Sequence, residues 1–278
     1  MSKNASLVIF LIILFLAAGI LNPARATEPE LWHLSSPANS EVVWQDGLME
    51  VNGIKASATH LRTPGSSEEI FKFYQDTLTK QGWEAKDSQT RDIKVFNKKD
   101  KFMYVMATPT LKNVPSQVYL IISPKDLALC NMFKDDFMKE PIAEDASGRD
   151  LVDLARYPAS KRRLNIFTPD QGALLIYEAE ATPSEVAKFY RAALKGSGWQ
   201  EDPTLNEETM QKMLPKLQVK DMFAILLYHR GDDAILINVA SAGKELFPGQ
   251  HRGSRSLVVI TKNMFKEFDS SLNKKGER

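Results

Sequence analysis

The sequence has little of what disulfide-stabilised or strongly charged proteins are built from. Of its 278 residues, a single one is cysteine, Cys130. One cysteine cannot form an intramolecular disulfide, and a chain of this length can bury a core large enough to fold without one. The 36 Lys and Arg nearly balance the 35 Asp and Glu. This balance argues against a general nucleic-acid-binding or anionic-membrane-binding surface.

Patterns for catalysis and metal binding are also missing. The four histidines, His33, His60, His229 and His251, have no second histidine or carboxylate at the spacing of a helical metal site. There is no G-x-S-x-G nucleophile elbow, no Gly-rich phosphate loop, and no papain-like signature around Cys130. We therefore predict no catalytic residue, no cofactor and no metal, and we interpret Cys130 as a small apolar side chain of the core.

The N-terminus has the three parts of a secretory signal peptide. Lys3 precedes an uncharged run over 7–21, and Ala24-Arg25-Ala26 has the A-x-A form of a cleavage site. We predict a signal peptide over 1–26, cleaved between Ala26 and Thr27, and a periplasmic or extracellular mature form. The apolar run is shorter than the roughly 20 residues that a membrane-spanning helix needs. Retention of the segment as an uncleaved anchor is the alternative.

One stretch of the chain occurs twice. Residues 66–83 read SSEEIFKFYQDTLTKQGW and residues 182–199 read TPSEVAKFYRAALKGSGW, at an offset of 116 residues with 7 of 18 positions identical. Self-similarity at a fixed spacing is typical of a duplicated structural unit. The sequence therefore predicts two copies of one small module.

Each copy of the stretch predicts a helix with both ends marked. Ser66 and Thr182 are N-cap residues, each with a glutamate three positions later, which is the spacing of a capping box. Apolar residues then recur at i, i+3, i+4 and i+8, which gives one buried stripe. Gly82 and Gly198 fit the left-handed residue that ends a helix, and the tryptophan that follows each can pack back on the last turn. We interpret these aromatic residues as core and cap rather than as a binding surface.

The order of the expected elements predicts an α+β fold. Module one spans 32–123 and module two spans 157–262, each with the order β-α-β-β-β and an antiparallel sheet that packs a helix on one face. A helical linker over 124–156 joins them, with its helix at 126–140, and a C-terminal helix and tail cover 263–278. The expected strands are 54–60, 93–96, 102–107 and 118–122 in module one, and 173–181, 222–228, 234–240 and 257–261 in module two.

The second module resembles a known class of sequence. It has the turn Tyr157-Pro158-Ala159-Ser160, then a strand, then a helix that contains Phe189-Tyr190 and ends at Gly198-Trp199. This pattern is similar to a widespread, poorly characterised class of bacterial exported proteins with a Tyr-Pro-Gly-Ala-like turn. Ala159 stands where that pattern has glycine, and module one keeps Pro37-Ala38-Asn39 without the tyrosine. The resemblance implies a bacterial envelope protein and specifies no substrate.

Two polar segments are candidate contact loops. Lys161-Arg162-Arg163 is the sharpest basic run, and His229-Arg230-Gly231-Asp232-Asp233 concentrates polar groups at a hairpin tip. The first could bind an anionic polymer or a lipid headgroup, and the second could contact a partner. Ordinary edge and turn chemistry also explains both segments. We expect that replacing Lys161, Arg162 and Arg163 by serine leaves folding intact.

These observations favour a non-catalytic binding or scaffolding component of the bacterial envelope, with another envelope protein as its partner and no nucleic acid. One alternative is an envelope hydrolase whose site is assembled from distant residues, which His60 or His229 facing a carboxylate in a cleft would favour. Another is a structural subunit of a secretion or surface assembly, which an exposed apolar patch of several hundred square ångströms would favour.

Overall fold

The chain folds into two units, each with six strands and one helix among its described residues. Unit 1 comprises residues 1–135, 167–170 and 270–278, and unit 2 comprises 136–166 and 171–269. The predicted signal peptide, most of the helix expected over 126–140, and the C-terminal helix and tail lie outside the described residues. The structure, a computed structural model, describes residues 34–86, 92–108, 115–130, 137, 141–169, 171–202, 223–242 and 255–263.

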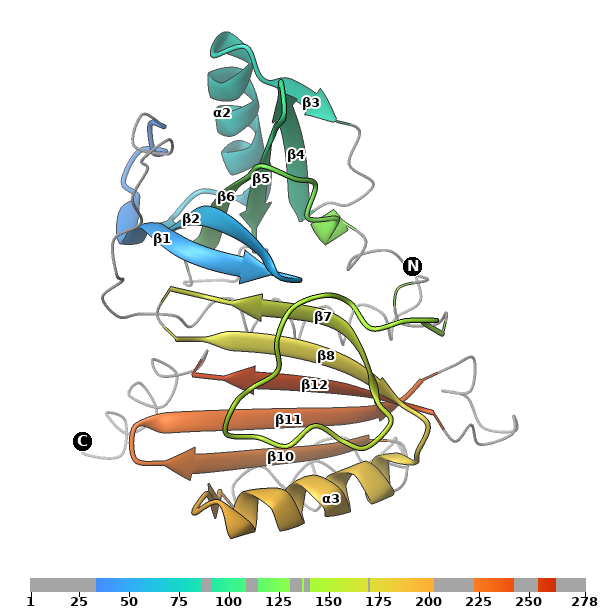
Figure 1. Cartoon of the computed structure of the whole chain (residues 1–278). Coiled ribbons are helices and arrows are strands. Elements are labelled where there is room, and N and C mark those ends of the chain that lie inside the picture. The colour runs from blue at the N-terminus through green and yellow to red at the C-terminus, as the bar shows by residue number, and fades with distance from the viewer. Residues whose placement is uncertain are drawn as a thin grey trace, which may run out of the picture. The chain divides into compact units, whose positions relative to one another are not determined.

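The described residues of unit 1 form six antiparallel strands and one helix (Figure 1). Its strands lie in the order β3-β4-β5-β6-β2-β1, so that β6 pairs with β2, far from it in sequence. Helix α2 packs on β5 and β3. The elements are β1 (Glu41–Val51), β2 (Ile54–Thr63), α2 (Ser67–Lys80), β3 (Glu84–Lys86), β4 (Ile93–Lys98), β5 (Lys101–Ala107) and β6 (Ser116–Ser123).

Unit 2 has the same order of elements and the same order of strands. Its sheet runs β9-β10-β11-β12-β8-β7, and α3 packs on β9, β10 and β11. The helices are 116 residues apart, so each position of unit 1 near α2 has a counterpart in unit 2. The elements are β7 (Lys161–Phe167), β8 (Ala173–Ala179), α3 (Pro183–Gly196), β9 (Gln200–Glu201), β10 (Phe223–Arg230), β11 (Asp233–Ser241) and β12 (Ser256–Lys262).

The expected α+β fold of two β-α-β-β-β modules is wrong. The described residues form mostly antiparallel sheet, with twelve strands and only two helices. The missed strands are β1, β3, β7 and β9. Register shifts between Val42 and Trp44 and between Trp44 and Gly47 interrupt the alternation of β1. Strand β7 begins with three basic residues. Because charged residues are typical of exposed segments, the sequence did not predict this strand, which is buried over most of its length.

The predicted helix starts are confirmed in both units. The Ser66 hydroxyl accepts a hydrogen bond from the Glu69 backbone N–H at 3.3 Å, and the Ser66 N–H donates to the Glu69 carboxylate at 2.8 Å. Thr182 and Glu185 make the same two contacts at the same distances. Each box satisfies backbone donors that the first helical turn leaves without a partner.

The predicted helix ends are confirmed as well. Gly82 and Gly198 have φ of 81° and 78°. The N–H of the following tryptophan donates to the carbonyl of the leucine five residues before it, at 3.0 Å in unit 1 and 3.2 Å in unit 2. This 6→1 bond is the Schellman motif, in which a left-handed residue lets the chain turn back on its last helical turn.

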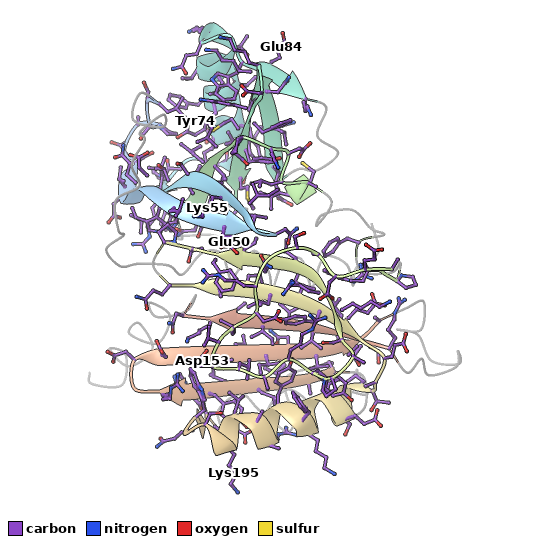
Figure 2. The ribbon with its side chains drawn as sticks, in the orientation of Figure 1. Glu50, Lys55, Tyr74, Glu84, Asp153 and Lys195 are labelled. Carbon is purple, nitrogen blue, oxygen red and sulfur yellow. The ribbon has the colours of Figure 1, made fainter. Side chains whose placement is uncertain are left out.

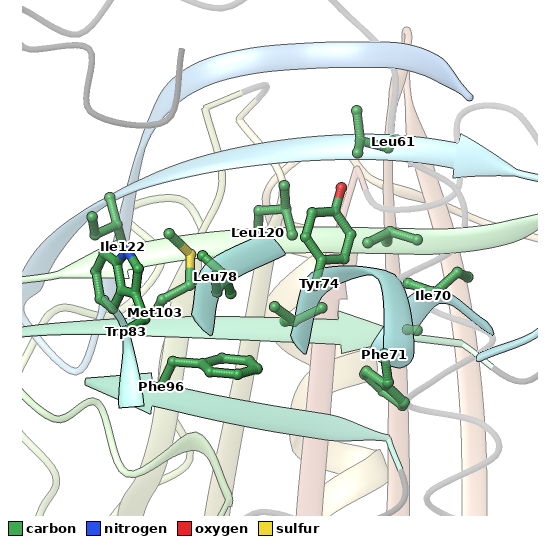
Figure 3. Close-up of a cluster of buried hydrophobic side chains, with 13 residues drawn as sticks. Leu61, Ile70, Phe71, Tyr74, Leu78, Trp83, Phe96, Met103, Leu120 and Ile122 are labelled. Carbon is green, nitrogen blue, oxygen red and sulfur yellow. The ribbon is translucent and has the colours of Figure 1, made fainter. Parts of the chain in front are cut away.

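The core of unit 1 lies between α2 and one face of its sheet (Figure 3). Tyr74 and Leu78, one helical turn apart, are fully buried. Alternate residues of the strands face them, as the two-residue period of a strand requires. The side chains of this core are Leu61, Ile70, Phe71, Tyr74, Leu78, Trp83, Phe96, Met103, Val105, Ala107, Val118, Leu120 and Ile122.

A left-handed turn precedes the first strand of each unit. Asn39 and Ala159 have φ of 60° and 56°, and the Ser40 and Ser160 N–H groups donate to the carbonyls of Pro37 and Tyr157 at 3.3 and 3.2 Å. Asparagine tolerates this conformation better than alanine does. The turn thus keeps its shape in unit 2 although alanine replaces the glycine expected there.

Candidate functional site

The basic run of unit 2 is a strand with paired charges rather than a contact loop. Lys161, Arg162 and Arg163 lie in β7. The Arg163 guanidinium binds the Glu178 carboxylate on β8, with Nε at 3.0 Å from Oε2, and the two side chains are 3% and 7% exposed. Arg255 lies 3.5 Å from the other Glu178 oxygen. Glu178 thus holds two guanidinium groups, which leaves Arg163 poorly placed to bind an external anion.

A segment without helix or strand, residues 141–156, crosses unit 2 and is called the strap below (Figure 1). The Asp145 carboxylate accepts from the Arg162 N–H at 2.7 Å and from both terminal nitrogens of Arg156 at 2.6 and 2.7 Å. The bond to Arg156 lowers the pKa of Asp145 to about 2. Asp150 pairs with Arg162 and accepts from Tyr177 at 2.9 Å.

These contacts argue against the expectation that serine at Lys161, Arg162 and Arg163 leaves folding intact. Those changes would leave the Glu178 carboxylate buried with one of its two guanidinium partners removed, and would remove an anchor of the strap. Removing one partner of a buried pair costs far more than removing an exposed charge.

The second candidate loop is a two-residue hairpin turn whose polar groups have local partners. Arg230 and Asp233 pair across the turn, and Gly231 has φ of 59°, as such tight turns require. His229 Nε2 lies 3.2 Å from the Asp202 carboxylate. The Asp233 carboxylate accepts from Asn263 at 2.8 Å, and Asp232 is exposed.

A polar and aromatic cluster that the sequence analysis did not single out lies in unit 1. It comprises Trp44, His60, Gln117 and Tyr119, and is called the histidine cluster below. The four residues come from the adjacent strands β1, β2 and β6, where His60 pairs with Trp44 on one side and with Tyr119 on the other. Leu61 faces α2 in the core, so His60, one residue before it, lies on the opposite face of the sheet.

Aromatic rings enclose the imidazole of His60. The Tyr119 ring stacks on it with centroids 4.4 Å apart and planes 6° apart, and Trp44 meets it edge-on at 5.7 Å. Such pairs are worth about 0.5–1.5 kcal/mol beyond the area that they bury. His60 is 0% exposed. Burial lowers the pKa of His60 to about 4, against the Gln117 bond, which raises it, so the ring is neutral at pH 7.

The hydrogen bonds around His60 assign its proton. Its Nε2 lies 2.8 Å from Gln117 Oε1, while the Gln117 amide nitrogen donates to the Pro115 carbonyl at 3.4 Å. The amide oxygen therefore faces the imidazole and can only accept, so Nε2 carries the hydrogen. Nδ1 is left as a buried acceptor, and no described residue donates to it.

The fold does not require this cluster. The 116-residue offset places Ile176 at the position of His60, and the sheet register places Val259 and Leu257 where unit 1 has Tyr119 and Gln117. Unit 2 thus builds the same three positions from aliphatic residues. A comparison of the two copies along their strands, rather than along their helices alone, is the sequence signal that finds the site.

The remaining candidates add no further centre within the residues that the structure describes. No group of three or more His, Cys, Asp or Glu there could hold a metal ion. Cys130 is partly exposed, and His33 and His251 lie outside the described residues. No helix in the described part of the chain is long and apolar enough to cross a membrane.

Comparison with known proteins yields one family and one solved structure. A family model described as START domain-like matches residues 48–115, which include His60 and all of α2. No curated protein matches the chain. The solved structure, "Structure of crystal form III of TP0453", is 8% identical, with 78% of this chain and 79% of that chain covered and a TM-score of 0.18. Similarity at that level does not establish a shared fold. The family match fits a poorly characterised module in unit 1.

Proposed function

We propose that this protein is an exported, non-catalytic binding component of the bacterial envelope, and that it binds through the histidine cluster of unit 1. The observation that carries the proposal is the difference between the two units at equivalent positions. His60, Gln117 and Tyr119 are buried where unit 2 has three aliphatic side chains.

The energetics support a role beyond packing. A buried polar atom without a partner costs about 1–3 kcal/mol, and Nδ1 of His60 has no donor among the residues that the structure describes. An isoleucine, as at position 176, carries no such cost. A ligand or partner group that donates to Nδ1 would recover this cost, and because His60 is 0% exposed, the cluster would have to open to admit it.

We also propose that the two units are tandem copies of one exported module. The 116-residue offset, the shared order of strands, and the left-handed turns at Asn39 and Ala159 support this. The START domain-like segment lies in the first copy. The predicted signal peptide supports export and a periplasmic or extracellular location.

The contacts of the histidines favour binding over hydrolysis. His229 has a carboxylate partner, Asp202, but no serine, threonine or cysteine among the described residues hydrogen-bonds to it. The partner of His60 is an amide. Among the described residues, this histidine–carboxylate pair therefore has no side-chain nucleophile for covalent hydrolysis.

The exposed apolar side chains weigh against a purely structural subunit. In the described ranges the exposed large ones are Val42, Leu48 and Val152. Three separate side chains do not amount to the patch of several hundred square ångströms that an assembly subunit would bury.

The test replaces the cluster by the residues of unit 2. A tagged chain carrying His60→Ile, Gln117→Leu and Tyr119→Val is compared with the unaltered chain by cross-linking in the native envelope, followed by mass spectrometry of the proteins and small molecules that co-purify. We expect a species that the unaltered chain retains and the triple variant loses. The exposed Lys55, on the same strand, provides the control Lys55→Ser. A folded triple variant that retains every co-purifying species would rule the cluster out as the binding site.

A further inference from the structure

Both units place a cation against the C-terminal end of their helix. Lys98 and Arg230 are the last residues of β4 and β10, each directly before a two-residue turn. The Lys98 ammonium donates to the Gln81 carbonyl at 2.6 Å, and Arg230 donates to the equivalent Ser197 carbonyl at 3.4 Å. A cation at this end satisfies a free carbonyl and offsets the helix dipole. This part of the arrangement is structural and common to both copies.

Unit 2 adds a second cation and a carboxylate beside Arg230, at the C-terminal end of α3. This group of Arg230, Lys262, Asp153 and Trp199 is called the corner below. Lys262 lies at the register position that Ile122 has in unit 1. One oxygen of Asp153, which is labelled in Figure 2, accepts from Arg230 at 2.6 Å and from Lys262 at 2.7 Å. Although burial raises the pKa of Asp153, the bond and charge of Lys262 and the charge of Arg230 outweigh it and hold that pKa below its ordinary value.

Both cations also lie over one aromatic ring. The Arg230 guanidinium is 4.4 Å and the Lys262 ammonium 5.9 Å from the centre of the Trp199 ring. Trp199 is 4% exposed, and its indole N–H has no acceptor among the described residues. The ring holds the two cations side by side over its face. Such a group of donors suits an anion.

Two carboxylates of the chain already face these cations: Asp153 of the strap, and Asp233 of β11, which lies 3.8 Å from the Lys262 ammonium. Residues 141–156 have no helix or strand, and Val152, next to Asp153, is 101% exposed. The Arg230, Lys262 and Asp153 side chains are 38%, 16% and 24% exposed. These side chains are partly exposed, so an anion from solvent can reach the cations and compete for them.

We propose that Arg230, Lys262 and Trp199 form a binding site for a carboxylate or phosphate group, and that Asp153 occupies it as an internal competitor. Release of Asp153 from the corner and binding of the external anion are then coupled: each favours the other. The proposal does not depend on the histidine cluster, which lies in unit 1.

The test removes the negative charge of Asp153 and keeps the shape of its side chain. Asp153→Asn is titrated with inorganic phosphate and, separately, with acetate, and binding is followed by the NMR signal of the Trp199 indole N–H and by thermal shift. We expect phosphate or acetate to bind this variant at least about tenfold more tightly than the unaltered chain, a difference of about 1.4 kcal/mol. The stronger of the two anions identifies the class of group. The double variant Asp153→Asn with Lys262→Ile carries the residue that unit 1 has at this position. It should bind phosphate or acetate no more tightly than the unaltered chain does.

The matched control is Asp232→Asn. It removes the same charge from the exposed turn next to Arg230 without touching the corner. A gain of the same size in this control, or no gain in Asp153→Asn, overturns the proposal. Should Asp153→Asn fail to fold, hydrogen exchange of the strap in the unaltered chain decides. Phosphate should then speed exchange over 150–156, and unchanged exchange at saturating phosphate would contradict the coupling.

Discussion

Unit 1 and unit 2 share one plan of strands and one capped helix, yet they bury polar groups in different places. Unit 1 buries a neutral imidazole among aromatic rings on the face of its sheet away from α2. Unit 2 has aliphatic residues at those positions and instead buries ion pairs of β7 and β8. The helix caps are what the fold needs, since they are the same in both. The polar residues that differ are where a specific role of each unit is to be sought.

The largest expected effect concerns the buried charges of unit 2. Arg163→Ser leaves the Glu178 carboxylate with the more distant Arg255 guanidinium and with the Ile142 backbone N–H, which donates to it at 3.3 Å. We expect a loss of about 3–5 kcal/mol in the free energy of unfolding, measured by urea denaturation. Lys195→Ser, an exposed change in the same unit, should cost less than about 0.5 kcal/mol. A loss below about 1 kcal/mol for Arg163→Ser would show that solvent reaches Glu178 readily.

The next effect concerns the imidazole of unit 1 and appears as a dependence on pH. The pKa of His60 is about 4 in the folded chain and 6.5 when unfolded, so the unfolded chain binds the proton more tightly. The contribution of His60 to the free energy of unfolding is fully present above about pH 6.5. It falls as the pH drops towards 4, and about 2 kcal/mol of it is lost at pH 5.

The matched variant His60→Ile carries the residue of unit 2 and removes this contribution. Urea denaturation gives the free energy of unfolding at pH 7.5 and at pH 5. Between these two pH values the variant should lose about 2 kcal/mol less of that free energy than the unaltered chain loses. Equal losses in the two proteins would mean that His60 is protonated as easily in the folded chain as in water.

A smaller effect should be the same in both units. Alanine at Gly82 or at Gly198 meets no close neighbour, but both glycines have positive φ. Each change should cost about 1–2 kcal/mol of unfolding free energy from the backbone alone. Gly196→Ala, two residues before Gly198 and inside α3 with open space around it, should instead stabilise by about 0.5–1 kcal/mol. Thermal denaturation of the three single variants checks the contrast, and very different costs at Gly82 and Gly198 would contradict equal caps.

The smallest effect tests the turn before β7. Ala159 has φ of 56°, which favours glycine over alanine, so Ala159→Gly should stabilise by about 0.5 kcal/mol. Asn39→Gly at the equivalent turn should be close to neutral, since asparagine already tolerates that conformation. A melting temperature that falls for Ala159→Gly would show that the turn is held by contacts of the alanine methyl group.

The elements that could be predicted are those whose causes are local. Neighbouring residues determine the helix caps and the buried apolar face of α2 and α3. They also determine strands β2, β4, β5, β6, β8, β10, β11 and β12, which the sequence predicted. Strand β7 could not be predicted, because its arginines are neutralised by Glu178 and Asp150, which are close only in the folded chain. The histidine cluster needed the register of β1, β2 and β6, which periodicity alone does not give.

The orientation of the Gln117 amide also limits what His60 can do with protons. A ring that relays a proton must take it up at one nitrogen and release it from the other. Here the hydrogen on Nε2 points to an oxygen that can only accept, while the amide nitrogen is held by the Pro115 carbonyl. No relay passes along this path unless the amide turns over. In this orientation the hydrogen of the His60 ring stays on Nε2, and the free lone pair stays on Nδ1.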